Sequence, residues 1–155
     1  MDTTIRKALI TDAKRIQSLV NTFAVKGDML MLNLNDVVEK LMEFCVCEYA
    51  GASPAVAGVC ALHPTWLDIA ELRSLAVERE MQNKGIGRLL VLKQLEWAKE
   101  LGFKRVFTLT YKSKFFASLG FNEVPKDELP KKMWTDCLKC LKYPDCDETA
   151  MIIHL

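Results

Sequence analysis

The spacing of apolar residues along this chain switches between two periods, and each period predicts a kind of element. Between residues 13 and 23 apolar residues recur every three or four positions, which predicts an amphipathic helix. Thr11 or Asp12 can cap its start, and Gly27 ends it. The residues before it, Ile5 to Ala8, are predicted to form a short opening strand.

Further helical stretches follow along the chain. Asn35 or Asp36 can cap a short one, and a longer one runs from Arg88 to Leu101 before Gly102 stops it. A last short helix is expected from Lys114 to Leu119. The residues expected to face the interior are Val38, Leu41 and Met42 in the first stretch and Leu89, Leu92, Leu95, Trp97 and Ala98 in the second.

Runs rich in β-branched and aromatic residues predict the strands. They span residues 44–49, 55–62, 69–77, 105–110 and 151–154. The second and third can close an antiparallel hairpin through a connection at His63 and Pro64, and a histidine in such a loop is expected to be structural. Residues 69–110 predict a strand, helix and strand crossover with parallel, right-handed geometry. We therefore expect a mixed α/β fold in a single domain over residues 1–155.

Charge and cysteine content exclude several classes of partner. Twenty-one basic residues against twenty acidic ones leave a formal charge of +1, so nothing global attracts nucleic acid or an anionic membrane. No apolar run approaches the roughly 20 residues that span a bilayer, and we expect a cytoplasmic protein. Cys45, Cys47 and Cys60 lie in strand-like runs and are expected to be reduced core thiols. Assembly as a homodimer is left open.

A glycine-rich segment carries the most specific chemistry. Gln82-Asn83-Lys84-Gly85-Ile86-Gly87 follows the apolar run Leu72 to Val77 and opens the amphipathic run that begins at Arg88. At such a helix start, free backbone N–H groups and the helix dipole converge on an anion. The spacing is not G-x-G-x-x-G, and Lys84 precedes its glycine, so neither a Rossmann nor a Walker loop fits.

The pattern Gln-x-x-Gly-x-Gly resembles the acetyl-coenzyme A loop of the GCN5-related N-acetyltransferases, the GNAT family. The flanking stretches AELRSLAV (Ala70 to Val77) and RVFTLTYKSKFFASLGF (Arg105 to Phe121) resemble the same family. They are most similar to the acetyltransferase domain of N-acetylglutamate synthases, whose short stand-alone forms end in a stretch like LPKKMWTDCLKC (Leu129 to Cys140). The resemblance implies a central, mostly antiparallel sheet with flanking helices and a parallel, splayed strand pair at the cofactor site.

The resemblance also implies the reaction and the cofactor site. The expected reaction moves an acetyl group from acetyl-CoA to the amine of a small acceptor, such as L-glutamate in arginine biosynthesis. Glycines at 85 and 87 let the backbone approach a diphosphate, and Lys84 and Arg88 add charge. The expected cofactor-binding residues are Leu75, Ala76 and Val77 along the pantetheine arm and Gln82, Asn83, Lys84, Gly85, Ile86, Gly87 and Arg88 in the loop.

Acetyl transfer to an amine needs a base, a donor to the carbonyl oxygen and an acid for the departing thiolate. Glu71 is the candidate base, acting through water, although it can equally be a strand carboxylate paired with Arg73. The backbone N–H of Leu75 or its neighbours can serve the carbonyl oxygen. The expected acceptor-binding residues are Arg73, Ser74 and Leu109.

The acid and the acceptor site depart from the family pattern. Many GNAT enzymes carry a tyrosine where this chain has Phe116, so the acid is sought at Thr110 or Tyr111, and phenol is the stronger acid. The synthases carry arginine after the first helix, where Met29 to Asp36 holds none. Arg73, Lys112, Lys131 and Lys132 remain as carboxylate partners. Glutamate therefore competes with a polyamine, drug or protein amine, and with a catalytically silent CoA sensor.

A cysteine cluster near the end of the chain raises a separate question. Cys137, Cys140 and Cys146 have the spacing of three zinc ligands, with His154 or Asp145 as a fourth. Pairs of this kind in reduced proteins are frequently plain thiols, and we favour that interpretation, with no metal site.

Overall fold

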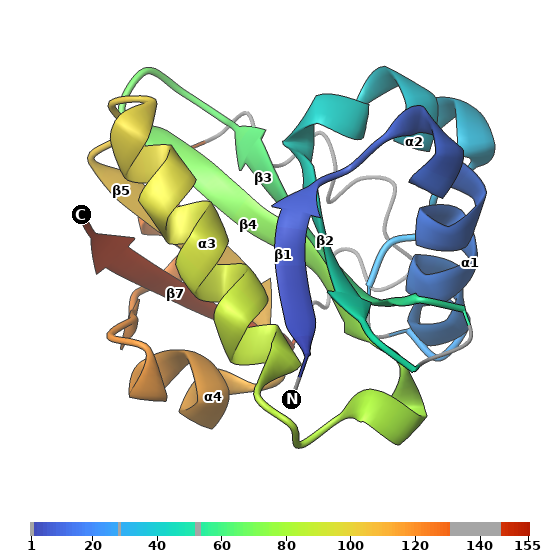
Figure 1. Ribbon diagram of the computed structural model, residues 1–155. Coiled ribbons are helices and arrows are strands. Elements are labelled where there is room, and N and C mark those ends of the chain that lie inside the picture. Colours follow the sequence, from blue (N-terminus) through green and yellow to red (C-terminus); the bar gives the residue numbers. More distant parts are fainter. Residues whose placement is uncertain (1, 28, 52–53, 131–146) are drawn as a thin grey trace.

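The computed structural model describes residues 2–27, 29–51, 54–130 and 147–155. A seven-stranded sheet with the order β1-β2-β3-β4-β5-β7-β6 forms its centre, with helices on both faces (Figure 1). The strands are β1 (Thr3–Lys7), β2 (Phe44–Tyr49), β3 (Val56–Pro64), β4 (Ile69–Val77), β5 (Arg105–Thr110), β6 (Asn122–Glu123) and β7 (Thr149–His154). The helices are α1 (Ala13–Ala24), α2 (Leu34–Glu39), α3 (Ile86–Glu100) and α4 (Ser113–Ser118), with short 3₁₀ turns η1 (Ile10–Asp12), η2 (Leu41–Glu43), η3 (Arg79–Met81) and η4 (Lys126–Glu128).

The strand pairing confirms the expected mixed α/β fold. Strands β1 to β4 pair antiparallel in chain order, and β4 pairs parallel with β5 through the α3 crossover. The parallel register covers only the residues from Ile69↔Arg105 to Glu71↔Phe107. Beyond Glu71, β4 continues to Val77 without β5 beside it. The two strands therefore diverge, as expected for the splayed pair.

A β-bulge divides β4 where this divergence begins. Between the pairs Ala61↔Arg73 and Val59↔Ala76, two residues of β4, Ser74 and Leu75, lie opposite one residue of β3, Cys60. Within the bulge Ser74 adopts φ 55°, a left-handed conformation that costs an L residue about 1–2 kcal/mol. Because side chains alternate along a strand, the extra residue reverses which face each following side chain points to. The sequence pattern did not reveal this bulge.

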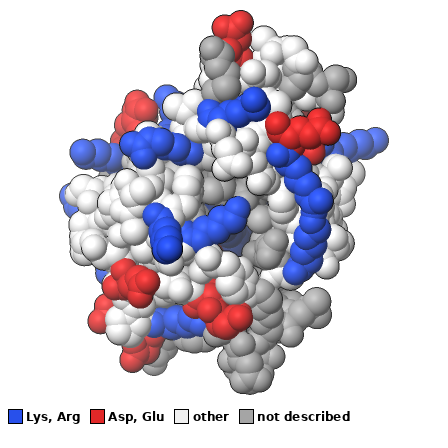
Figure 2. Space-filling model, turned by 90° about the horizontal axis from the view of Figure 1, so that it is seen from below, with Lys and Arg blue, Asp and Glu red and all other residues white. Residues whose placement is uncertain are grey.

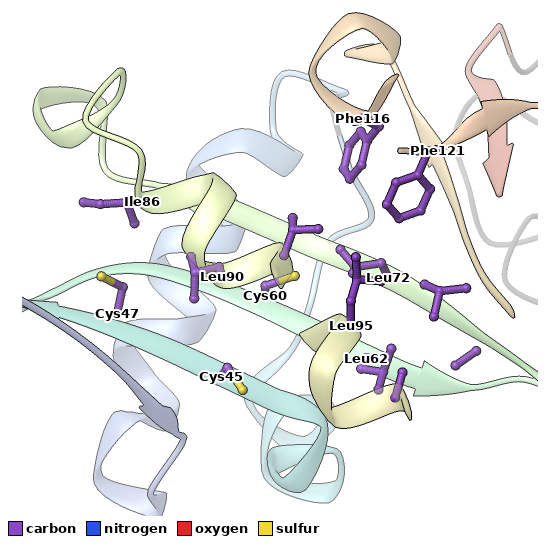
Figure 3. Close-up of a cluster of buried hydrophobic side chains, with 14 of the residues drawn as sticks. Cys45, Cys47, Cys60, Leu62, Leu72, Ile86, Leu90, Leu95, Phe116 and Phe121 are labelled. Atoms are coloured by element: carbon purple, nitrogen blue, oxygen red, sulfur yellow. The ribbon is translucent and has the colours of Figure 1, made fainter. Parts of the chain in front are cut away.

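The largest part of the core lies between α3 and the sheet (Figure 3). Gly58 of β3 allows the helix to approach, because a Cβ there would lie 2.9 Å from both Ile86 Cγ2 and Leu90 Cδ1. The described cysteines are buried and free, which confirms the prediction of core thiols, and burial raises the pKa of each. A second cluster, on the opposite face, packs α1 and α2 against the sheet. No helix in the described part of the chain is long and apolar enough to cross a bilayer.

The predicted cap of α2 was wrong, and that of α1 was right in position only. Asp12 is the N-cap residue of α1 but its side chain makes no capping hydrogen bond; the carboxylate instead accepts the Leu9 N–H at 2.8 Å and lies 2.7 Å from Arg6 Nη1. In α2 the cap is Asn33, whose side chain accepts the N–H of Asp36 at 2.7 Å, so Asp36 is the third residue of a capping box. The Asp12 carboxylate is taken up by other donors, and in α2 an asparagine two residues earlier accepts the N–H, neither of which a cap preference alone resolves.

Two predicted helix faces also need correction. In the short-helix segment Val37 is buried, whereas Val38 is exposed and Met42 is 83% exposed. In α3 Leu95 and Ala98 are buried as expected, whereas Leu89 and Leu92 are exposed and Leu90 and Val91 are buried in their place. The buried residues of this helix are Ile86, Leu90, Val91, Gln94, Leu95 and Ala98. The contact with Gly58 sets this rotation of the helix, and apolar spacing alone could not distinguish two crowded faces.

Candidate active site

The loop between β4 and α3 has the backbone geometry of an anion-binding turn. Asn83 and Gly85 adopt φ 62° and 83°, and Gly85 is the cap residue of α3, with no side-chain cap. The helical hydrogen bonds begin with Leu89 N–H to Gly85 O at 3.1 Å. The N–H groups of the first helical turn therefore have no acceptor within the helix. The surroundings of Gly85 are open, since a Cβ there would meet no atom within 4 Å.

Side chains around this loop either hold it or carry charge. Gln82 Nε2 donates to Val77 O at 3.0 Å, which ties the loop to the end of β4. Gly87 faces Phe115 of α4, whose Cζ would lie 3.5 Å from an added Cβ. Lys84 and Arg88 are exposed. Figure 2 views the molecule from the end where this loop and α4 lie, and basic side chains occupy the middle of that face.

A side-chain hydrogen bond links β4 and β5 at the point where the two strands begin to separate. Thr108 Oγ1 donates to Leu72 O at 2.9 Å, just past the last parallel pair, and this hydroxyl is buried. It satisfies a carbonyl that the departing strand no longer pairs. From there Leu75, Ala76 and Val77 continue along β4 toward the anion-binding loop. Along the chain, the unpaired edge of β4 is thus followed by the N-terminus of α3.

Four ionisable side chains lie together on the sheet face opposite α3. Arg73 Nη1 is 3.6 Å from Glu71 Oε1, and Arg73 Nη2 is 4.0 Å from Glu43 Oε1. His63 Nδ1 lies 2.9 Å from Glu43 Oε1. All four side chains are 13–28% exposed. This geometry shows the pairing of Glu71 with Arg73, which was the alternative to a role as base, and a carboxylate paired in this way can still accept a proton.

The two candidate acids at the end of β5 differ in environment. The Tyr111 hydroxyl is exposed and donates to Asp147 Oδ1 at 2.6 Å. The Thr110 hydroxyl is buried and accepts the N–H of Lys112 at 2.8 Å, so its own hydrogen is not used in that bond. Phe116 packs edge-to-face against Phe115 and Phe121 in the core. No hydroxyl replaces the family tyrosine at that position.

The expected site residues fall into two groups in space. Leu75 and Val77 pack on the α3 side with the start of the helix, whereas Ala76 packs in the cluster on the opposite face, where Glu71 and Arg73 also lie. Ser74 sits between them in the bulge, and Leu109 packs in a small cluster with Phe107 and Leu129. Lys131, Lys132, Cys137, Cys140 and Cys146 lie outside the described residues. Within those residues no group of three or more His, Cys, Asp or Glu could hold a metal ion.

Sequence reasoning missed three residues of this region. His63 lies within β3, because the strand runs to Pro64, and not in a loop as expected. No sequence motif pointed to Glu43, because it lies in a 3₁₀ turn twenty residues before His63. Thr108 was hidden in a regular strand pattern. Only the strand register brings them beside the expected residues.

Comparison with known proteins identifies the family. A sequence profile described as the Acetyltransferase (GNAT) family matches residues 18–121. The chain belongs to this family. It is 41% identical to an uncharacterised N-acetyltransferase of Chlorobaculum tepidum, over 97% of this chain and 96% of that protein. It is 39% identical to an amino-acid acetyltransferase of Mycobacterium tuberculosis, over 77% of this chain and 68% of that protein.

A solved structure supports the same assignment. The N-acetylglutamate synthase of Neisseria gonorrhoeae, complexed with coenzyme A and N-acetyl-glutamate, matches with a TM-score of 0.88 and 25% identity. The match covers all of this chain and 35% of that one. The GNAT assignment accounts for the divergence of β4 and β5 beside the glycine turn.

Proposed function

We propose that this GNAT protein transfers an acetyl group from acetyl-CoA to the amine of an amino acid, with L-glutamate as the favoured acceptor. The observation that carries the proposal is the opened edge of β4 leading directly into the uncapped N-terminus of α3. The amides of Gly85, Ile86 and Gly87 suit a diphosphate, and the edge from Leu75 to Val77 suits an amide-containing arm. The amino-acid acetyltransferase and the N-acetylglutamate synthase among the similar proteins support the acceptor class.

In this proposal Glu71 removes a proton from the acceptor's ammonium through water. Arg73 Nη1 lies 3.6 Å from Glu71 Oε1, so a fixed cation faces the proposed base. The backbone N–H groups at Ser74 and Leu75 are the proposed donors to the carbonyl oxygen that gains charge. Tyr111 protonates the departing thiolate, with Thr110 as the other candidate. Tyr111 must first release Asp147, whereas Thr110 needs no such change.

A different amine is the second candidate acceptor. Arg73 already forms ion pairs with two carboxylates, Glu71 and Glu43, so an acceptor carboxylate would have to compete with them for the guanidinium. The segment from Met29 to Asp36 contributes no arginine. An acceptor with one carboxylate, or with none, would need fewer fixed cations than glutamate does.

One assay separates these candidates. Free thiol released from acetyl-CoA is measured with L-glutamate, other amino acids and a set of polyamines and peptide amines. Turnover highest with glutamate supports the proposal, and turnover only with other amines supports the second candidate. Acetyl-CoA binding in calorimetry without turnover of any amine would instead indicate a CoA-binding sensor. Failure to bind acetyl-CoA at millimolar concentration would contradict all three.

A further inference from the structure

The register of the sheet places a histidine opposite the candidate base. His63 of β3 and Glu71 of β4 are direct antiparallel partners, and Ala61 pairs with Arg73 two positions away. Directly opposed residues carry their side chains on the same face, with Cβ atoms about 4.5–5.5 Å apart. His63 therefore lies within reach of Glu71, either directly or through one water.

The imidazole of His63 is oriented by a second carboxylate. Nδ1 lies 2.9 and 3.1 Å from the two carboxylate oxygens of Glu43. An Nδ1–H that donates to Glu43 leaves Nε2 of the neutral ring as an acceptor. Among the described residues no hydrogen bond to Nε2 is formed. This is the arrangement in which a carboxylate both fixes the tautomer and stabilises an imidazolium.

Glu43 is itself held in place from the other side of the sheet. The buried side chain of Gln94 in α3 donates from Nε2 to Glu43 O at 3.1 Å and to Cys60 O at 2.7 Å. The backbone at Glu43 is thus attached both to the core helix and to the neighbouring strand. Because the backbone at Glu43 is fixed, its carboxylate can orient the His63 ring at little cost in the conformational entropy of Glu43.

We infer that His63 receives the proton that Glu71 takes from the acceptor's ammonium, and that Glu43 stabilises the resulting imidazolium. The inference rests on the proposed function. An N–H bond of the ammonium breaks as a bridging water takes that proton and passes one of its own to a Glu71 oxygen, and the new O–H bond on Glu71 then breaks as an H–Nε2 bond forms on His63. The proton leaves to solvent, to which His63 is 28% exposed. Because His63 acts through Glu71, it is a positioning residue.

The charges around His63 favour this transfer. Within the described residues the ionisable groups that face it are Glu43 from η2 and Glu71 and Arg73 from β4. Two carboxylates and one guanidinium give this group a charge of −1 while His63 is neutral. Accepting a proton brings it to zero. The restored Glu71 carboxylate is then ready for the next acceptor.

The test is the pH profile of kcat/KM for the acceptor, measured with His63→Asn. We expect kcat to fall by about tenfold or more, the range of general acid–base effects, with acetyl-CoA affinity changed by less than twofold. The acidic limb due to the imidazole should disappear, and free imidazole in the buffer should restore part of the rate. The matched control is His154→Asn, which removes the chain's other histidine at the exposed end of β7 and should keep the wild-type profile.

Glu43→Gln provides a second measurement that does not depend on removing the ring. It keeps an acceptor for Nδ1 but removes the charge that stabilises the imidazolium, so the acidic limb should move to lower pH. A wild-type profile in both variants, with no rescue by imidazole, would overturn the inference while leaving the proposed function intact. An absence of acceptor turnover in the wild-type protein would contradict the proposed function itself. If His63→Asn does not fold, the direction of the Glu43→Gln shift decides.

Discussion

The two sides of this site are built in different ways. The proposed cofactor side is one continuous segment, residues 82–88, whose open amides and left-handed turn residues belong to the backbone. The proposed acceptor side is a cluster of side chains from η2, β3 and β4, joined by ion pairs. A backbone site depends on conformation and tolerates changes of side chain. A side-chain site depends on the exact charges present, and single substitutions should therefore affect the two sides in different measurements.

The largest effect is expected on the acceptor side from Glu71→Gln. Loss of the carboxylate removes the proposed base, and we expect kcat to fall by about a hundredfold or more. Acetyl-CoA affinity, measured by calorimetry, should change less than twofold, because the cofactor loop lies on the other side of the sheet. Glu123→Gln removes a carboxylate from exposed β6 and is the control. A rate within threefold of wild type would show that Glu71 only pairs with Arg73.

Tyr111→Phe is expected to have the next largest effect. Removing the phenol should lower kcat by more than about tenfold if it protonates the thiolate, again with little change in cofactor affinity. Thr110→Val, which removes the buried hydroxyl two positions beyond Thr108, is the comparison. If Thr110→Val reduces kcat and Tyr111→Phe does not, the acid is threonine and the bond from Tyr111 to Asp147 is structural.

On the cofactor side, Gly85→Ala should act on affinity and not on chemistry. We expect the KM for acetyl-CoA to rise by about tenfold, because a methyl group at the left-handed cap strains the turn and occupies the space next to the amides. Gly102→Ala is a matched control, since Gly102 also has positive φ and open surroundings but lies at the other end of α3. Both variants should lose similar stability in thermal melts. An equal rise in KM for both would argue against a cofactor role for the loop.

The smallest effect is expected from Thr108→Val, which concerns the boundary between the two sides. The valine has the same shape but leaves Leu72 O without its donor, at a cost of about 1–3 kcal/mol. Thermal unfolding should show a decrease in Tm of several degrees. Thr22→Val removes a comparable bond to a backbone carbonyl at an exposed helical position, and should cost less. Equal decreases in Tm would mean that the buried bond from Thr108 to Leu72 O stabilises the fold no more than an exposed one.

The sequence predicted the strands more accurately than the helix details. The bounds of β2, β4 and β5 are those expected from their β-branched and aromatic content. Predictions of helix caps and buried faces were less accurate. The bonds of Asp12 and Asn33 depend on which local partners are available, and the buried face of α3 depends on its contact with Gly58 of β3. Local composition fixes a strand within a few residues, whereas the rotation of a helix depends on what it packs against.

The sequence alone determined the family and the glycine turn before α3, since a short contiguous motif specifies backbone conformation through its own glycines. It also identified Glu71 and Arg73 as neighbours, because residues two apart in a strand share a face. Only the tertiary structure brought Glu43 and His63 to them. That association depends on the register between β3 and β4, which is decided by the packing of the whole sheet and by no local run of residues.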